Sequence, residues 1–252
     1  MADSARYAYA VTRGLEPSLL DGDRGLREAP LEVVASGGLD AVVADVPLEE
    51  FSADALRQNL EDLGWLEEVA RGHDDVVRRV AGLGPTAPLR LATIFLDDDG
   101  VRARLEEWHD AIVEVLDRVD GRAEWSVKVV ASPAEPATTD TSEPASGAEY
   151  LRRRKARADD RGQWELQVAR VAEEVHAAVS EVAVATRLLP PQDPQLTGLT
   201  GAMALNGAYL VDRDRQEQFE QAVTAMRGRF PDVTVASGGP WPPYSFAVLD
   251  QS

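Results

Sequence analysis

Residues 132–148 divide the chain, because they interrupt a sequence that otherwise alternates between strand-like and helix-like patterns. The stretch holds Pro133, Pro136 and Pro144 among small polar residues and contains no large apolar side chain. Proline denies the backbone a hydrogen-bond donor, and such a composition favours a linker. With 252 residues the chain is long enough for two domains that each bury a core. The sequence therefore predicts an N-terminal domain over 1–131, the linker 132–148, and a C-terminal domain over 149–252.

The N-terminal domain is expected to contain several strands. Apolar runs and period-two alternation predict them over 7–11, 31–35, 39–46, 88–95 and 124–130. The second and third are expected to form a hairpin through Ser36-Gly37-Gly38. The run Pro88–Phe95 is rich in apolar residues, has Arg90 as its one charge, and is expected to be one buried strand.

Two long helices are expected to accompany these strands. Helical spacing of apolar residues predicts them over 52–80 and 101–119. Gly64 and Gly72 predict a bend or break in the first, since glycine weakens a helix interior by about 1 kcal/mol. Trp108 lies on the apolar stripe of the second helix and Trp125 on the apolar face of the following strand. Both indoles are therefore expected to be buried in the N-terminal domain.

The C-terminal domain is predicted to be a smaller α+β unit with a long opening helix. That helix is expected over 149–182, and a second one from about 212 to 230. Strands are expected over 184–189, 203–211, 233–236 and, at the end, 244–249. Pro240, Pro242 and Pro243 exclude a helix or a central strand in residues 238–243.

The tail 238–252 carries three aromatic residues whose exposure would favour aggregation. Trp241, Tyr244 and Phe246 are therefore predicted to pack against the body of the protein, returning to the first half of the chain. The alternative is that they anchor a partner protein, because Trp and Tyr dominate binding hot spots.

The charge is strongly negative and unevenly placed. The formal net charge is −18; residues 1–131 carry 14 basic and 27 acidic side chains, and residues 149–252 carry 12 and 14. An acidic first half argues against general nucleic-acid binding and favours solubility or a basic partner. The stretch Arg152, Arg153, Arg154 and Lys155 is expected to be solvated or to pair with the acidic first half of the chain; the alternative is that it docks an acidic partner.

No catalytic or cofactor-binding pattern is found. The sequence contains no phosphate loop, no dinucleotide-binding glycine motif, no nucleophile elbow and no cysteine. His73, His109 and His176 lack a second ligand at zinc spacing, and His73 is expected to be a core histidine rather than a general base. The acids Asp97, Asp98 and Asp99 are interpreted as a helix cap, with a cation site as the alternative. No enzyme activity and no cofactor are predicted.

The N-terminus shows no basic segment followed by an apolar core, so no signal peptide is expected. No apolar run reaches the roughly 18–20 residues that cross a bilayer. The absence of cysteine is compatible with a reducing cytoplasm.

Several segments together resemble the gas vesicle protein F/L family. The segments are Tyr7–Val11, Trp65–His73, Pro88–Phe95, Glu124–Val129, Tyr150–Lys155, Leu205–Arg213 and Gly239–Phe246, and their order and spacing cover nearly the whole chain. One departure is Leu91-Ala92, where the resemblance leads us to expect an aromatic residue and a glycine. The resemblance does not include the linker.

The resemblance implies a fold and a function. It implies an α+β protein of two domains, the first a modified ferredoxin-like fold. It also implies a non-enzymatic accessory or minor structural protein of the gas vesicle, a gas-filled buoyancy compartment. Such a protein would lie in the cytoplasm at the vesicle, bind the hydrophobic major shell protein and other accessory proteins, and assist nucleation or assembly. The alternative is a small-ligand-binding regulatory module, since ferredoxin-like units often bind metabolites, although this rests on fold analogy.

Overall fold

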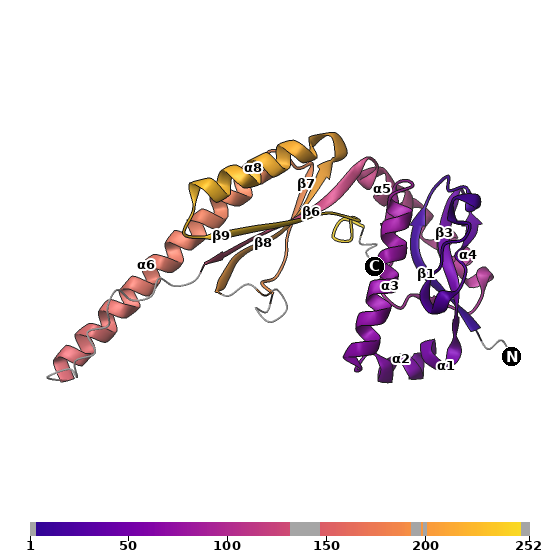
Figure 1. Ribbon diagram of the computed structural model, residues 1–252, viewed down its shortest axis with the longest axis horizontal. Coiled ribbons are helices and arrows are strands. Elements are labelled where there is room, and N and C mark those ends of the chain that lie inside the picture. The colour runs from indigo at the N-terminus through magenta and orange to yellow at the C-terminus, as the bar shows by residue number, and fades with distance from the viewer. Residues whose placement is uncertain (1–3, 132–146, 193–197, 199–200, 248–252) are drawn as a thin grey trace. The chain divides into compact units, whose positions relative to one another are not determined.

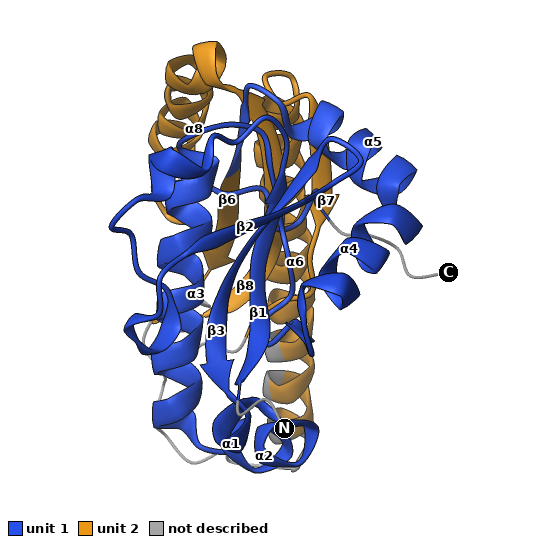
Figure 2. Ribbon diagram, turned by 90° about the vertical axis from the view of Figure 1, so that its right-hand side faces the viewer, with its two compact units in different colours: residues 1–124, 240–252 blue, residues 125–239 orange. Residues whose placement is uncertain are grey.

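The structure is a computed structural model that describes residues 4–131, 147–192, 198 and 201–247 (Figure 1). The chain forms two compact units (Figure 2): residues 1–124 together with 240–252, and residues 125–239. This division differs from the predicted domain bounds in two ways. The strand predicted over 124–130 enters the second unit, and the C-terminal segment belongs to the first. The predicted linker falls largely on residues 132–146, which lie outside the described residues.

Unit 1 is built on a sheet whose strands run in the order β2-β3-β1-β4, with β5 also pairing with β1. The strands are β1 (Ser4–Thr12), β2 (Glu32–Ser36), β3 (Leu39–Pro47), β4 (Thr86–Pro88) and β5 (Ile94–Phe95). The predicted hairpin is confirmed, because Ser36 pairs with Leu39 across an antiparallel turn. Along β1, Tyr7 and Tyr9 face one core while Ala8 and Val11 face another. The central strand is thus buried on both faces.

The expected single strand over 88–95 is wrong. β4 ends at Pro88, β5 begins at Ile94, and the chain turns between them. Thr93 closes the turn, since its N–H and its hydroxyl both donate to the Arg90 carbonyl, at 3.2 and 2.7 Å. Ala92 adopts a φ of +60°, the left-handed conformation that L-residues disfavour. The departure noted at this position, alanine where glycine was expected, therefore coincides with backbone strain.

Replacing Ala92 by glycine is expected to raise the free energy of unfolding by about 0.5–1 kcal/mol. The left-handed conformation costs an L-residue about 1–2 kcal/mol, and glycine avoids this cost. Glycine in turn loses about 0.5–1 kcal/mol more backbone entropy on folding than alanine does, so part of the gain remains. Urea unfolding of the two proteins measures the difference. Ala87→Gly, in the buried strand β4, is the matched control and is expected to destabilise. Destabilisation by both changes would contradict the assignment of strain.

The helix expected over 52–80 is broken. After β3 come α1 (Leu48–Phe51), α2 (Ala53–Asn59) and α3 (Leu63–Ala81). The break falls just before Gly64, where the Asp62 side chain caps α3 by accepting from the backbone N–H groups of Gly64 and Trp65. Gly72 lies in an unbroken part of α3; a Cβ there would come within 2.7 Å of Leu26. Glycine at this position thus permits the close approach of η2 (Leu26–Glu28).

The helix expected over 101–119 is also two helices, α4 (Asp98–Glu107) and α5 (His109–Val119), which meet at Trp108. They cover the face of the sheet opposite α3 and contribute Val101, Leu105, Ile112, Val115 and Leu116 to its core. Trp108 was expected to be buried. It is only half-buried: it lies at the junction of the two helices, packs against the edge of the core, and carries the Arg104 guanidinium 4.4 Å from its ring centre.

Unit 2 carries a second sheet in the order β7-β8-β6-β9. Its elements are β6 (Arg122–Ala131), α6 (Gly147–Ser180), β7 (Ala185–Leu188), β8 (Ala202–Asp212), η3 (Arg213–Arg215), α8 (Gln216–Arg229) and β9 (Thr234–Trp241). The order β-α-β-β-α-β and this strand arrangement are those of the ferredoxin-like motif. In unit 1 the connection from β1 to β2 contains η1 (Pro17–Leu20) and η2 instead of a helix, which modifies the motif. The predicted α+β class with two sheet-containing parts is confirmed.

Trp125 was correctly expected to be buried but was assigned to the wrong core. β6 pairs within the second sheet, so Trp125, Val127 and Val129 face the core of unit 2. That core also contains Tyr209 and Phe219, and the rings of Trp125 and Phe219 lie 5.6 Å apart. Alternation along β6 identified the buried face, but not the sheet to which it belongs.

Helix α6 packs along only part of its length. Its buried side chains are Val168, Val171, Ala172, Val175 and Val179, all in the second half of the helix. Side chains described before Val168 are mostly exposed, and they include Leu151 and Leu166. Within the described ranges, no helix is both long and apolar enough to span a bilayer.

The final segment departs from the predicted strand. β9 continues through Pro240 to Trp241. It is an edge strand, and an edge strand tolerates proline because one side of it needs no N–H donor. Residues 244–246 then form a turn in which the N–H groups of Phe246 and Ala247 donate to the Pro243 carbonyl. The expectation of a strand from Tyr244 is therefore wrong over residues 244–247.

Candidate functional site

The C-terminal segment is fastened to unit 1 by polar contacts. The buried Glu124 carboxylate accepts hydrogen bonds from the Ser245 N–H and hydroxyl, both at 2.7 Å. The Tyr244 hydroxyl donates to Asp74 at 3.1 Å, and Arg78 lies over the Trp241 ring at 4.2 Å. Burial, together with the nearby Asp74 carboxylate, raises the pKa of Tyr244, so this hydroxyl stays protonated and able to donate.

The predicted return of the tail to the first half of the chain is confirmed, since residues 240–252 belong to unit 1. Phe246 is buried and Ala247 joins the core beneath α4 and α5. Trp241 and Tyr244 remain 40% and 37% exposed. These two rings are thus held in place and still accessible, and their role as an anchor for a partner stays a prediction.

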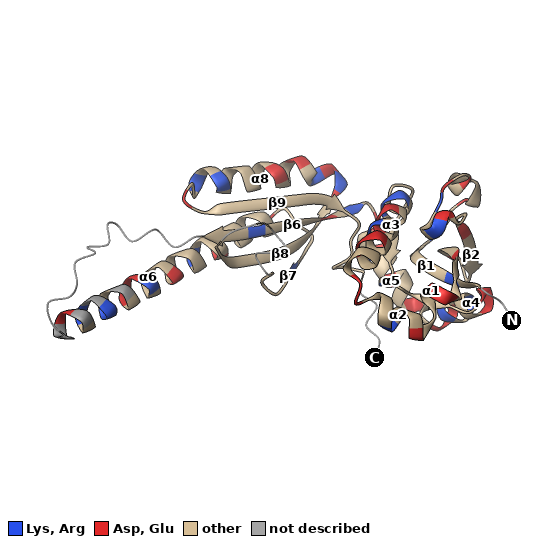
Figure 3. Ribbon diagram, turned by 60° about the horizontal axis from the view of Figure 1, so that its bottom comes forward, with Lys and Arg blue, Asp and Glu red and all other residues tan. Residues whose placement is uncertain are grey.

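The basic stretch lies in the first turns of α6 (Figure 3). Arg152, Arg154 and Lys155 are exposed; the side chain of Arg153 lies outside the described residues. Exposed side chains agree with a solvated turn and equally with a docking site for an acidic partner, so both stay predictions.

His73 belongs to an aromatic cluster under α3, as expected of a core histidine. The residue is 3% exposed, and its ring centre lies 5.7 Å from those of both Tyr7 and Tyr9. Burial lowers the pKa of His73 to about 4, against the opposing influence of the Leu89 backbone and the Asp74 charge. The imidazole is therefore neutral at physiological pH.

The hydrogen bonds around Tyr7 fix the tautomer of His73. The Ala92 N–H donates to the Tyr7 hydroxyl oxygen at 3.1 Å, and His73 Nδ1 lies 3.0 Å from the same oxygen. No other described group accepts the Tyr7 proton, so Tyr7 donates to Nδ1 and the imidazole proton sits on Nε2. The helical periodicity around His73 predicted that this residue is buried. It did not predict the contacts with Tyr7 and Ala92, because these residues lie in distant segments of the chain.

A cavity of about 510 Å³ adjoins this cluster. It is lined by Ala70, His73, Asp74, Pro88, Leu89, Arg90, Leu91, Thr93, Trp108, Tyr244 and Ala247. The lining thus comes from α3, from the turn after β4, from the junction of α4 and α5, and from the C-terminal segment. All of these belong to unit 1.

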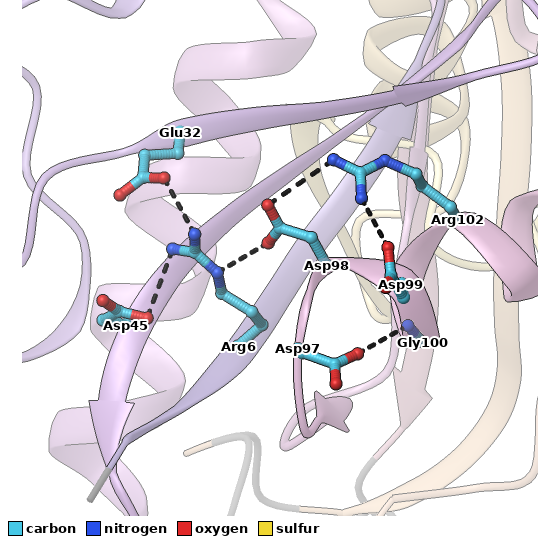
Figure 4. A network of polar contacts seen from close by, with 8 residues as sticks. All are labelled: Arg6, Glu32, Asp45, Asp97, Asp98, Asp99, Gly100 and Arg102. Carbon is cyan, nitrogen blue, oxygen red and sulfur yellow. Dashed lines mark hydrogen bonds and ion pairs between the residues drawn. The ribbon is translucent and has the colours of Figure 1, made fainter. Parts of the chain in front are cut away.

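The acids at 97–99 act as a cap and as ion-pair partners, as the first interpretation held (Figure 4). Asp97 accepts from the Gly100 N–H at 2.8 Å, and Arg102 pairs with Asp98 and Asp99. Asp98 also bonds Arg6 at 2.8 Å.

Arg6 sits at the centre of this network and was not identified from the sequence. It contacts Glu32 at 3.0 Å and Asp45 at 3.2 Å in addition to Asp98. Burial alone would lower the pKa of Arg6, but the bond to Glu32 and the surrounding carboxylates raise it overall. Its guanidinium is the cation that these three carboxylates surround. Among the described residues, no group of three or more His, Asp or Glu side chains is arranged to hold a metal.

The other two histidines have structural partners. His109 contacts Asp110 and the Gly37 carbonyl, at 3.0 and 3.1 Å. His176 bonds the buried Tyr209 hydroxyl at 2.8 Å. Both imidazoles are thus tied to neighbouring groups of the fold, and His176 also lies 3.5 Å from the Ser180 hydroxyl.

Comparison with known sequences gives matches over nearly the whole chain. A family model described as gas vesicle synthesis protein GvpL/GvpF matches residues 5–248. Gas vesicle protein L of Streptomyces sp. (strain CB03234) is 43% identical over 254 residues, which cover 98% of this chain and 94% of that protein. Gas vesicle protein F of the same strain is 29% identical, with coverage of 95% and 98%.

Comparison with solved structures gives the same fold. The crystal structure of GvpF from Anabaena sp. PCC7120 matches with a TM-score of 0.71 at 17% identity, covering 98% of both chains. GvpF from Microcystis aeruginosa matches with a TM-score of 0.68 at 17% identity, covering 97% and 99%. Because the family model spans almost the entire sequence, the chain belongs to the GvpL/GvpF family of gas vesicle synthesis proteins.

Proposed function

We propose that the protein is a non-enzymatic accessory protein that binds the hydrophobic shell protein of the gas vesicle and assists its nucleation or assembly. The observation that carries the proposal is the family match over residues 5–248. We place the protein in the cytoplasm, at the growing vesicle, together with other accessory proteins.

The physical need for such a helper follows from the nature of a hydrophobic shell subunit. Before it polymerises, such a subunit exposes apolar surface and is prone to aggregate. A soluble partner with a formal net charge of −18 would cover part of that surface and keep the complex dispersed through charge repulsion. Trp241 and Tyr244, partly exposed and held by their contacts to α3, are the candidate apolar contacts, and the buried Phe246 belongs to the same segment. Arg152, Arg153, Arg154 and Lys155 are the candidate polar contacts.

Deletion of the gene in a vesicle-forming host is expected to abolish or deform the vesicles, because assembly would lose its accessory protein. Electron microscopy of the cells measures this, and a plasmid-borne copy of the intact gene is the control for restored assembly. Vesicles of normal number and shape in the deletion strain would overturn the proposal.

The same strain separates the two candidate surfaces. A copy carrying Trp241→Ala and Tyr244→Ala tests the aromatic contacts, and a copy carrying Arg152→Gln, Arg154→Gln and Lys155→Gln tests the basic ones. Each purified variant is compared by circular dichroism with the unaltered protein, so that a loss of vesicles without a loss of fold identifies the contact surface. Normal vesicles with both variants would remove these residues from the proposal while leaving the family role intact.

A further inference from the structure

The cavity beside His73 has the size and the walls of a small-molecule site. Its volume of about 510 Å³ falls within the roughly 300–1,000 Å³ of typical ligand pockets. Leu89, Leu91, Trp108 and Ala247 give it apolar walls. The lining also carries polar residues, among them His73, Asp74 and Arg90, and such a mixture of apolar walls and polar groups is usual in a site that orients its ligand by directed contacts.

One of those polar groups is a buried donor without a partner. The tautomer set by Tyr7 places the imidazole proton on His73 Nε2. Nε2 is buried, and no described group forms a hydrogen bond of good geometry with it, although a Leu89 backbone group lies near enough to the ring to raise its pKa slightly against the effect of burial. Because buried donors are almost always satisfied in folded proteins, this N–H calls for an acceptor supplied from within the cavity.

The second polar group is a cation without a counter-ion. Arg90 lines the cavity, its side chain is exposed, and within the described part of the chain no carboxylate pairs with it. Asp74, the acid in the lining, is already bonded by Arg78 and by the Tyr244 hydroxyl. The cavity therefore offers a neutral N–H donor and a free guanidinium, both of which suit an anionic acceptor.

We propose that this cavity binds a small molecule that carries a carboxylate head and an apolar body. The carboxylate accepts from His73 Nε2 and pairs with Arg90, while the apolar body lies against Leu89, Leu91 and Trp108. An amine head would meet the His73 N–H and the Arg90 cation, and the one carboxylate in the lining, Asp74, is already bonded by Arg78 and Tyr244. An alcohol would leave Arg90 without a counter-ion. The inference is independent of the assembly role, since it rests on the cavity alone.

Titration calorimetry of the full chain tests the proposal with hexanoate and 3-phenylpropanoate as probes. Both are expected to bind saturably with a Kd of about 1 mM or tighter. The matched probes hexan-1-ol and hexylamine have the same apolar body without the carboxylate and are expected to bind about tenfold more weakly or not at all.

Arg90→Gln is expected to weaken hexanoate binding about tenfold, since it removes the charge while its backbone bonds to Thr93 remain. Arg71→Gln is the matched control: Arg71 is an exposed arginine of α3, paired with Glu67, outside the cavity lining. It is expected to leave the Kd unchanged. Equal affinity for hexanoate and hexan-1-ol, or equal losses in the two variants, would overturn the proposal.

Nitrogen-15 NMR of the histidine side chains supplies a readout that does not depend on affinity. At neutral pH the protein without a probe is expected to show His73 protonated at Nε2, and hexanoate is expected to shift that nitrogen. A His73 signal from the Nδ1-protonated form would remove the donor and refute the site. Binding of hexanoate that leaves the Nε2 signal unmoved would place the ligand elsewhere and refute it as well.

Discussion

Replacement of Trp125 by alanine is expected to lower the free energy of unfolding by about 3–5 kcal/mol. The indole is 4% exposed and packs in the core of unit 2, with its ring 5.6 Å from that of Phe219. Truncation removes a large apolar group and leaves a cavity among side chains of the sheet and of α8 that relax only in part. Urea unfolding followed by circular dichroism measures the loss.

Two further variants make this result specific. Trp108→Ala is the matched control in unit 1: its indole is only half-buried, so its removal is expected to cost less than half as much. Trp125→Phe keeps a ring beside Phe219 and removes an indole N–H that lacks a partner in the described structure, so a cost of about 1 kcal/mol is expected. Equal losses from Trp125→Ala and Trp108→Ala would show that burial does not separate these positions.

The elements that the sequence predicted well are those encoded by local periodicity. Alternation identified the buried face of β6, and the Ser36–Gly38 turn signal identified the β2–β3 hairpin. In both cases a repeat of two residues is enough to fix which side chains share a face. The apolar stripes of α3 and of α5 were found for the same reason, since helical spacing is equally local.

The errors arise where distant parts of the chain decide the local conformation. The apolar run 88–95 has strand composition, yet Ala92 turns into the left-handed region, where its N–H bonds Tyr7 of β1. The helical spacing of apolar residues continues from Val101 to Val119, so it does not predict that one helix ends and the next begins at Trp108. That β6 joins the second sheet depends on strand pairing with residues after 185, which periodicity does not specify.

The sequence identified candidate residues within single segments, but it did not identify sites whose residues come from several segments. The aromatic tail and the basic stretch stand out in composition, and the tail's return to unit 1 followed from the cost of exposing it. The Arg6 network and the His73 cavity did not stand out, because their members come from β1, β2, β3, α3 and the turn after β4. Such groupings are products of the fold rather than of any one segment.

Acidification is expected to destabilise the protein through His73. Its pKa is about 4 in the folded state, because burial disfavours the charged ring, and is near 6.5 when the chain unfolds. Between these values the unfolded chain binds a proton that the folded protein does not, so stability falls as the pH drops below 6.5. The loss reaches about 3 kcal/mol near pH 4 and does not grow further, since below that value both states are protonated.

His73→Gln isolates this contribution, because glutamine occupies a similar space and does not titrate near these pH values. At pH 7 the variant is expected to be the less stable protein, having lost the aromatic contacts to Tyr7 and Tyr9. Other titrating groups, such as His109 with its raised pKa, act alike in both proteins and cancel in the comparison. The stability difference between wild type and variant is therefore expected to shrink by about 2 kcal/mol from pH 7 to pH 5 in urea unfolding. A difference that stays constant over this range would mean that His73 is not held neutral by burial, and the tautomer assigned to it would lose its basis.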